Sequence, residues 1–209
     1  MVSLPFGIAC AWLLARYEFH GKALFDGIVH LPLVLPPVAI GFALLVLFGR
    51  HGVMGAWLYT MFGFTFAFNW KGAALASAVV AFPLMVRTMR LSLEGVDQRL
   101  EAAARTLGAG RWRCAMTITL PLMAPGILTG AILAFARSVG EFGATITFVS
   151  NIPGQTRTLP IALYTLTQIP GGDTAAWRLA ILSVILALAA LIASDAIGRR
   201  LGRRVRGLE

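Results

Sequence analysis

The side chains that usually bind metals or act as nucleophiles are few in this chain and lie far apart in sequence. There are two cysteines, Cys10 and Cys114, and three histidines, His20, His30 and His51. A metal site built from such residues needs closely spaced ligand pairs of the Cys-x-x-Cys kind, and the sequence contains none. We therefore predict no metal site, no cofactor and no catalytic residue.

The sequence also lacks a loop that could bind the phosphates of ATP. Such a loop has the pattern G-x-x-x-x-G-K-[ST], in which backbone N–H groups surround the phosphates. Gly21-Lys22 is followed by Ala23 rather than Ser or Thr, and the upstream glycine is missing. The chain is therefore not expected to bind ATP through such a loop.

Two opposite charges, Arg137 and Glu141, stand four residues apart in a long stretch that is otherwise uncharged. On one helix this spacing allows them to pair. Two interpretations stay open: a structural salt bridge, or a functional pair of charges in an apolar stretch, with the hydroxyls of Ser138, Thr145 and Thr147 nearby in sequence.

The composition shows which elements must position these residues. Hydrophobic residues make up 58% of the 209 residues and charged residues 13%, with a mean hydropathy of +0.79. Soluble domains are about 45–50% apolar and about 25% charged. The charges cluster between long neutral runs, which is typical of several membrane spans. We predict an all-α transmembrane bundle that forms a single domain over residues 1–209.

Five segments are predicted to cross the membrane: residues 1–14, 29–48, 72–89, 118–136 and 179–197. The first is short for a span of about 20 residues, so we expect the natural chain to begin earlier. The second contains Pro32, Pro36 and Pro37 and is expected to be kinked or broken, because proline removes a helix hydrogen bond. In the fourth, Gly126 and Gly130 form a GxxxG pair that indicates a packing face.

Two further stretches are neutral but interrupted. Residues 52–70 are rich in aromatic side chains and fit the membrane–water interface. Residues 142–172 contain Pro153, Pro160 and Pro170 and are interpreted as a loop with a short helix that re-enters the membrane. An additional span in either stretch would invert part of the topology.

The distribution of basic residues predicts the orientation. With five spans, one side carries 13 of the 18 Lys and Arg residues and the other carries 5. Loops rich in Lys and Arg stay in the cytoplasm, so the first side is cytoplasmic. The C-terminal tail is then cytoplasmic. The basic residues of that side are Arg16, Lys22, Arg87, Arg90, Arg99, Arg105, Arg111, Arg113, Arg199, Arg200, Arg203, Arg204 and Arg206.

The predicted cytoplasmic loop at residues 90–117 is longer than a simple connection requires. Apolar residues recur in it at three- and four-residue steps, which predicts an amphipathic helix. Glu101 and Arg105 form an i, i+4 pair on its polar side, and Gly108 follows its last apolar residue, where a left-handed turn is common. These features fit either a helix lying on lipid or a docking element for a soluble partner. The apolar residues are Leu93, Val96, Leu100, Ala103, Ala104 and Leu107.

The spacing of this loop resembles the EAA loop of bacterial ABC importer permeases, whose pattern is E-A-A-x3-G-x9-I-x-L-P. The Glu of the pattern falls on Ala102, and Glu101 lies one residue earlier. The resemblance implies that the loop docks on an ATPase subunit. The implied docking residues are Glu101, Ala102, Ala103, Ala104, Arg105, Gly108, Ala109, Gly110, Ile118, Leu120 and Pro121.

The resemblance extends over nearly the whole chain and is strongest to the oxyanion branch of these permeases, in particular the molybdate permeases. It is carried by residues 31–37, 82–87, 134–144 and 151–160. It implies a homodimer, two copies of an ABC ATPase subunit, a periplasmic oxyanion-binding protein and a bacterial inner-membrane location. The expected function is ATP-driven import of molybdate by alternating access, with ATP hydrolysed in the separate subunit and with sulfate or tungstate as the alternative cargo. With such a cargo, the functional interpretation puts Arg137 near the anion path and Glu141 as its counter-ion or gate latch. The hydroxyls of Ser138, Thr145 and Thr147 would then contact the tetrahedral dianion.

Other classes of function fit the sequence less well. A net charge of +9 could indicate a nucleic-acid partner, but no basic soluble domain is present to bind one. An enzyme acting on lipid-linked substrates would need intramembrane carboxylates or histidines, and the spans offer only Glu141 and Asp195. A secondary transporter would show an inverted repeat, which the sequence lacks.

Overall fold

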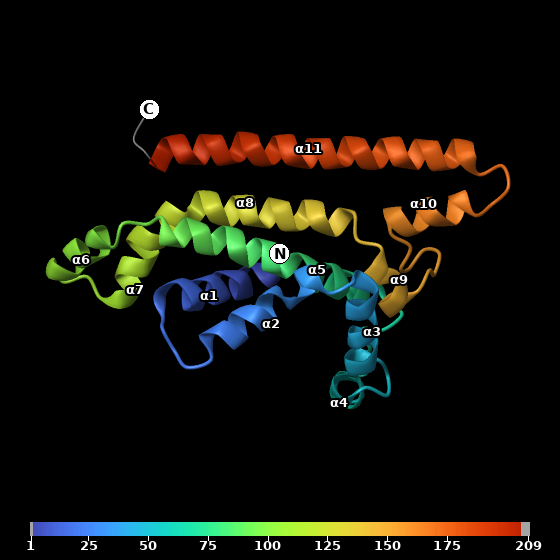
Figure 1. Cartoon of the computed structure of the whole chain (residues 1–209), viewed down its shortest axis with the longest axis horizontal. Helices are drawn as coiled ribbons and strands as arrows, with labels where there is room; N and C mark the ends of the chain where they lie inside the picture. Colours follow the sequence, from blue (N-terminus) through green and yellow to red (C-terminus); the bar gives the residue numbers. More distant parts are fainter. Residues whose placement is uncertain (1, 206–209) are drawn as a thin grey trace. The chain divides into compact units, whose positions relative to one another are not determined.

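A computed structural model describes the backbone of residues 2–205 and the side chains of residues 2–193, 195 and 196. Every regular element within this range is helical (Figure 1). The elements are α1 (Ser3–Arg16), α2 (Lys22–Val34), α3 (Pro37–Phe48), α4 (Val53–Phe62), α5 (Trp70–Glu94), α6 (Gln98–Thr106), α7 (Arg111–Cys114), the π-helical turn η1 (Ala115–Thr119), α8 (Leu120–Val139), α9 (Gly143–Val149), α10 (Leu159–Thr167) and α11 (Asp173–Val205).

Three helical stretches among the described residues are long and apolar enough to cross a membrane: Trp70–Glu94, Arg111–Val139 and Asp173–Ala193. They contain the third and fourth predicted spans, and the last of them covers residues 179–193 of the fifth. The first predicted span corresponds to α1, whose 14 residues make it one of the shorter apolar helices. The all-helical membrane class expected from composition is therefore confirmed.

The second predicted span is not one straight helix. α2 and α3 are separated at Leu35 and Pro36 and bend by 116° with respect to each other. Pro36 has extended backbone angles (φ −56°, ψ 133°), and Pro37 follows as the first residue of α3. Two consecutive prolines remove two N–H donors and force the preceding residue out of the helical region, so the helix ends before them. If the bent pair counts as one span, the described residues hold four.

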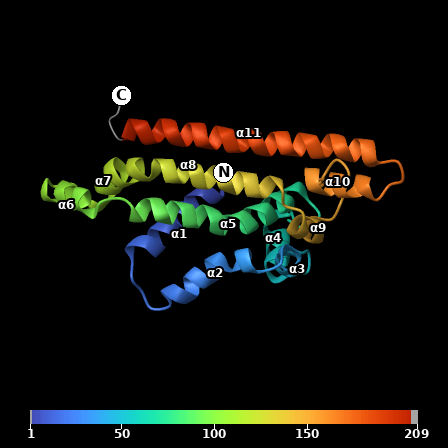
Figure 2. The ribbon, with the colours of Figure 1, turned by 45° about the horizontal axis from the view of Figure 1, so that its top comes forward.

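The first compact unit consists of residues 1–27, 84–134 and 190–209. Within it, two ion pairs join elements far apart in sequence: Arg16 at the end of α1 with Glu101 in α6, and Arg90 in α5 with Asp26 in α2. Figures 1 and 2 both show α6 and α7 beside the last turns of α5 and the start of α8. Residues 15–27 and 90–117, which were predicted for the cytoplasmic side, belong to this same unit.

The second compact unit consists of residues 28–83 and 135–189. Its core forms where α3 and α9 pack against each other and against the first half of α5. Gly41 permits this close approach, because a Cβ there would lie 2.5 Å from the carbonyl oxygen of Ala144. The fully buried residues of this core include Ala76, Ala144, Phe148 and Val149.

The two ambiguous stretches both contain helix. Residues 52–70 form α4 and an aromatic loop, in which Phe64 packs edge-on against Phe66 with ring centroids 5.2 Å apart. Residues 142–172 form two helices, α9 and α10, rather than the single short helix expected. Two of the three prolines of this stretch flank α10: Pro160 lies in its first turn and Pro170 lies after its end. Proline is tolerated at both positions.

Candidate functional site

The candidate docking helix α6 is defined at both ends by local hydrogen bonds. At its start, the Asp97 carboxylate accepts a hydrogen bond from the N–H of Arg99 at 2.9 Å, as an N-cap does. At its end, the N–H of Ala109 donates to the carbonyl of Ala104 and that of Gly108 to the carbonyl of Arg105, both at 3.0 Å. This pair of bonds is a Schellman motif. Gly108 has φ +86°, which confirms the predicted left-handed turn.

The single amphipathic helix expected from Leu93 to Leu107 is wrong in its extent and in its buried face. Leu93 belongs to α5 and is fully buried, Val96 lies in the turn, and α6 starts only at Gln98. Within α6, the apolar residues Leu100 and Ala103 are exposed, and Leu107 just after it is 89% exposed. The turn at Gly95–Asp97 rotates α6 so that a carboxylate faces inward instead.

That carboxylate is Glu101, the only residue of α6 classed as buried. Its Oε1 atom accepts hydrogen bonds from Arg16 Nη2 at 2.6 Å and from the Thr119 hydroxyl at 2.9 Å. Its backbone carbonyl accepts from the Cys114 thiol at 3.8 Å. The predicted partner Arg105 is 3.9 Å away and half-exposed, so it contributes less than Arg16. Charged residues are rarely buried unless paired, and Glu101 is paired.

The remaining predicted docking residues follow α6 into a long helix. Arg111-Trp112-Arg113 form the first turn of the stretch Arg111–Val139. The Ile118-x-Leu120-Pro121 motif begins in the π-helical turn η1 and ends in α8, and the N–H of Leu120 donates to the carbonyl of Ala115. Pro121 cannot donate and its ring would crowd the carbonyl four residues back, which explains a widened turn just before it.

The surface of this loop is apolar where the sequence predicted a partner. Ala102 and Gly110 are exposed, and Ala104, Ala109, Ile118 and Leu120 are half-buried. Several large apolar side chains are exposed on its surface in the described part of the chain. They are Leu100 (48% exposed), Leu107 (89%), Trp112 (80%) and Met116 (57%).

The pair predicted for the anion path forms a salt bridge. Arg137 Nη1 lies 2.8 Å from Glu141 Oε2, with 36% of the Arg137 side chain and 1% of the Glu141 side chain exposed. The two residues do not share one helix, because α8 ends at Val139. Glu141 Oε1 accepts a hydrogen bond from the N–H of Ala144 at 2.8 Å. The carboxylate therefore joins the end of α8 to the start of α9, where a negative charge is favourable.

The hydroxyls predicted to contact an anion are engaged with backbone groups. Thr145 is fully buried and donates to the carbonyls of Glu141 and Phe142. Thr147 donates to the carbonyl of Gly143 at 2.8 Å, and Ser138 to that of Ser77 at 3.4 Å. A hydroxyl oxygen that donates to backbone can still accept, but it has no second proton for an anion. Their role at an anion path stays a prediction.

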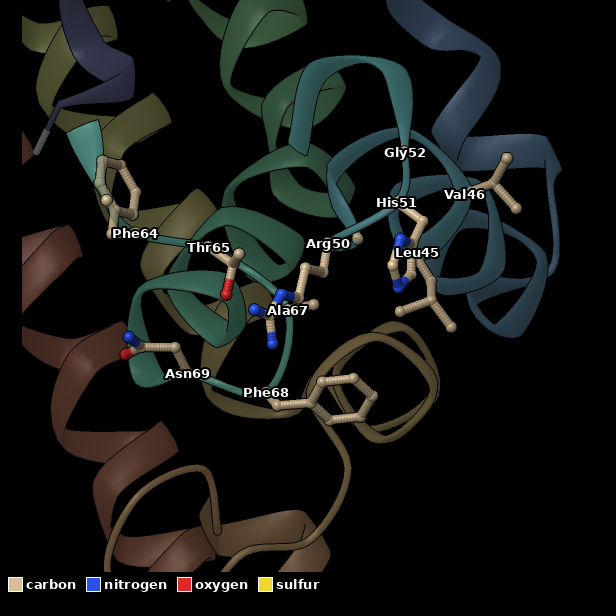
Figure 3. A pocket seen from close by; sticks show the side chains of 12 residues that line it. Leu45, Val46, Arg50, His51, Gly52, Phe64, Thr65, Ala67, Phe68 and Asn69 are labelled. Atoms are coloured by element: carbon tan, nitrogen blue, oxygen red, sulfur yellow. The ribbon is translucent and has the colours of Figure 1, made fainter. Parts of the chain in front are cut away.

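A hollow of about 970 Å³ opens in the second unit between the α3–α4 turn and the aromatic loop. Figure 3 shows Arg50 between His51 and Gly52 on one side and Thr65 and Asn69 on the other. None of its lining residues is acidic. Arg50 lies over the Tyr59 ring, with its Cζ 4.9 Å from the ring centroid, so it is already partnered in a cation–π contact.

Comparison with known proteins identifies the family to which this chain belongs. The family described as "Binding-protein-dependent transport system inner membrane component" matches residues 3–207. The chain belongs to this family. It is 64% identical over 199 residues to the molybdenum transport system permease protein ModB of Escherichia coli (strain K12), covering 95% of this chain and 87% of that protein.

Two other relatives show how the similarity falls away. The ModB protein of Haemophilus influenzae is 57% identical, with 97% of this chain and 89% of that protein covered. The sulfate transport system permease protein CysT of E. coli (strain K12) is 38% identical, with 97% and 72% covered. The chain is thus more similar to these molybdenum permeases than to this sulfate permease.

Solved ABC transporters share the fold at low sequence identity. The methionine transporter MetNI in an inward-facing conformation matches with a TM-score of 0.72 and 18% identity, over 96% of this chain and 86% of that one. A bacterial alginate ABC transporter in complex with its alginate-bound periplasmic protein matches with a TM-score of 0.67 and 16% identity, over 96% and 74%. The fold is that of an ABC importer permease.

The family assigns the chain to the inner membrane and to transport rather than to an enzyme class, and it implies that the chain works with other components of a transport system.

Two residues of the predicted docking region were missed by sequence reasoning. Arg16 and Thr119 complete the surroundings of Glu101. The one signal for Arg16 was its position as a charge directly after an apolar run.

Proposed function

We propose that this chain is the membrane-spanning permease subunit of an ATP-driven importer that carries molybdate across the inner membrane. The observation that carries the proposal is the 64% identity to the E. coli molybdenum permease over 95% of the chain. The alternative cargoes are sulfate and tungstate, which are also tetrahedral dianions, and a secondary transporter is the less favoured alternative. The lower identity of 38% to the E. coli sulfate permease favours molybdate.

The complete transporter in this proposal contains two copies of the chain, two ABC ATPase subunits and a periplasmic oxyanion-binding protein, embedded in lipid and without nucleic acid. The apolar surface of residues 100–116 supports the ATPase contact. Four large apolar side chains are exposed there on one short segment, and such a patch usually marks an interaction site. The window of α11 that could span the membrane is only 6% buried within the chain, which leaves it available to lipid or to a second copy.

ATP-driven closure of the ATPase dimer would move the docking loops and switch the two permeases between inward- and outward-open states. Such alternating access is a bistable rigid-body change. The C-terminal tail, whose residues Arg199, Arg200, Arg203, Arg204 and Arg206 have side chains outside the described residues, is proposed to lie in the cytoplasm.

Arg137 is proposed to attract the dianion along its path, with Glu141 as counter-ion. Its side chain is 36% exposed while that of Glu141 is 1% exposed, so the guanidinium is the accessible member of the pair. A permease should hold its cargo weakly, because tight binding would block release.

Reconstitution tests the function directly. The purified complex in liposomes, supplied with its binding protein and ATP, should take up labelled molybdate, and excess sulfate should compete poorly. A non-hydrolysable ATP analogue is the control, and uptake should stop with it. Uptake driven by an ion gradient without ATP would support a secondary transporter, and preferential uptake of sulfate would identify the alternative cargo.

A further inference from the structure

The docking helix α6 is attached to the rest of its unit in an unusual way. A helix normally packs through a stripe of apolar side chains. In α6 the apolar residues are exposed or half-buried, and the one buried side chain is that of Glu101. The carboxylate therefore provides the inward-facing contact that an apolar stripe would otherwise make.

The partners of Glu101 come from two different elements of the first unit. Arg16 is the last residue of α1, 85 residues earlier in the chain, and its guanidinium lies 2.6 Å from Oε1. Thr119 is the last residue of η1 and is 1% exposed. The exposed fractions of the Arg16 and Glu101 side chains are 12% and 11%, so water screens the ion pair little.

The Thr119 contact lies at a place where the helix changes its pitch. Single π-helical turns inside α-helices occur often at functional sites, and η1 separates α7 from α8. A carboxylate that holds η1 and α1 at once connects the docking helix both to the start of a membrane helix and to the end of another.

The arrangement leaves hydrogen-bonding capacity unused. Arg16 Nε is buried and has no hydrogen-bond partner among the described residues. Glu101 Oε2 has Arg105 only at 3.9 Å, beyond hydrogen-bond distance. The Arg16 guanidinium and the Glu101 carboxylate each have one hydrogen-bonded atom and one atom without such a bond among the described residues. When α6 shifts, the two groups can therefore exchange the atoms that pair, and the carboxylate stays paired.

We infer that Glu101 is an internal anchor of the docking helix, which transmits its displacement to α1 and α8 rather than contacting the ATPase. The inference rests on the proposed function, since it assumes that an ATPase moves α6. Glu101 is then a positioning residue for transport, and the apolar side chains of residues 100–116 make the contact with the ATPase.

The test separates docking from coupling. Glu101→Gln keeps an oxygen that can accept from Thr119 but removes the charge that holds Arg16. We expect the ATPase to co-purify with this variant at the wild-type level and to hydrolyse ATP. Uptake per ATP hydrolysed should fall at least about fivefold, because coupling between two sites in a protein typically changes an equilibrium by about fivefold or more. The charge-swapped pair Arg16→Glu with Glu101→Arg should recover part of the coupling.

Glu18→Gln is the matched control, because it removes one carboxylate whose side chain is 89% exposed and pairs only with Lys22. It should leave uptake per ATP unchanged. If Glu101→Gln fails to accumulate, Thr119→Val provides a milder change of similar volume that leaves the ion pair in place. Thr119→Val should also lower uptake per ATP, as Glu101→Gln does.

Two results would overturn the inference: loss of ATPase co-purification with Glu101→Gln, which would place Glu101 in the interface, or unchanged coupling in Glu101→Gln and Thr119→Val. The cargo used is whichever oxyanion the wild-type complex takes up. A failure of the molybdate proposal therefore appears in the wild type, whereas a failure of the anchor appears only in the variants.

Discussion

At the scale of single residues, Gly108 is the clearest case of a residue type dictated by backbone conformation. Its φ of +86° lies in the left-handed region, where a Cβ costs about 1–2 kcal/mol. No heavy atom would lie within 4 Å of an added Cβ, so the cost of a substitution comes from conformation and not from crowding.

We expect Gly108→Val to misdirect the turn after α6 and to uncouple ATP hydrolysis from transport, because a β-branched residue is strongly disfavoured at positive φ. Uptake per ATP, measured on complexes normalised for subunit content, should fall severalfold. Gly27→Ala is the control, since Gly27 lies in α2, has no positive φ and has nothing within 4 Å of an added Cβ. Wild-type coupling in Gly108→Val would exclude the turn from the mechanism.

The ion pair of Arg137 and Glu141 needs a different test from the one that its sequence spacing suggests. Truncating both residues to Ala would remove the charge pair and also the acceptor for the N–H of Ala144. Folding would then suffer for a reason unrelated to the anion. Glu141→Gln keeps an oxygen for that N–H and removes only the charge.

We expect Arg137→Ala alone to lower the amount of assembled complex, because it leaves the buried carboxylate of Glu141 without its cation. The cost should stay below the about 3–5 kcal/mol of a fully buried pair, since the Arg137 side chain is 36% exposed. The double variant Arg137→Ala with Glu141→Gln should restore assembly. Its uptake per assembled complex should stay low if Arg137 attracts the dianion. Full transport by the double variant would leave the pair with a structural role only.

At the scale of elements, the small residues of α8 decide how closely it approaches α5 within the first unit. A Cβ on Gly126 would lie 2.1 Å from the Cβ of Ser92, and one on Gly130 would lie 3.1 Å from the carbonyl oxygen of Met85. The GxxxG pair of the sequence therefore faces α5, as small residues at helix contacts in membranes do.

Gly126→Ala should force the two helices apart at this point and destabilise the protein by about 1–3 kcal/mol, the usual cost of overpacking. Thermal unfolding followed by size-exclusion chromatography should show a transition lower by several degrees. The compensating change Ser92→Gly, which removes the atoms in the way, should restore the transition temperature in the double variant. Gly140→Ala, with nothing within 4 Å, is the control and should behave like the wild type.

At the scale of the whole molecule, the orientation in the membrane is the property with the most consequences. The positive-inside bias predicts a cytoplasmic C-terminus. A C-terminal phosphatase, which is active only in the periplasm, should therefore be silent, and a fluorescent protein at the same place should be bright. The opposite pattern would contradict the five-span arrangement with its basic loops in the cytoplasm, and the bent pair α2–α3 would be the first place to look.

Much of the fold could be predicted from the sequence. The helices containing the third, fourth and fifth spans follow from long apolar runs, and the Gly108 turn follows from one residue type after an apolar pattern. The ion pair of Arg137 and Glu141 could be predicted from its spacing, although the break of α8 at Val139 between its two members could not. The local sequence pattern does not show whether α8 continues past Val139. It ends there, and the buried carboxylate of Glu141 accepts a hydrogen bond at the start of the next helix, α9.

By itself, then, the sequence determined the class of protein, the long apolar helices and the left-handed turn of the predicted docking loop, because composition, periodicity and glycine preference act over neighbouring residues. The tertiary structure decided which charges meet. Glu101 looked like the polar side of an amphipathic helix, yet it is buried against Arg16 from a helix 85 residues away. The 116° bend between α2 and α3 also needed the fold, since two prolines end a helix but do not set its new direction. Burial and pairing depend on long-range packing, which no local pattern encodes.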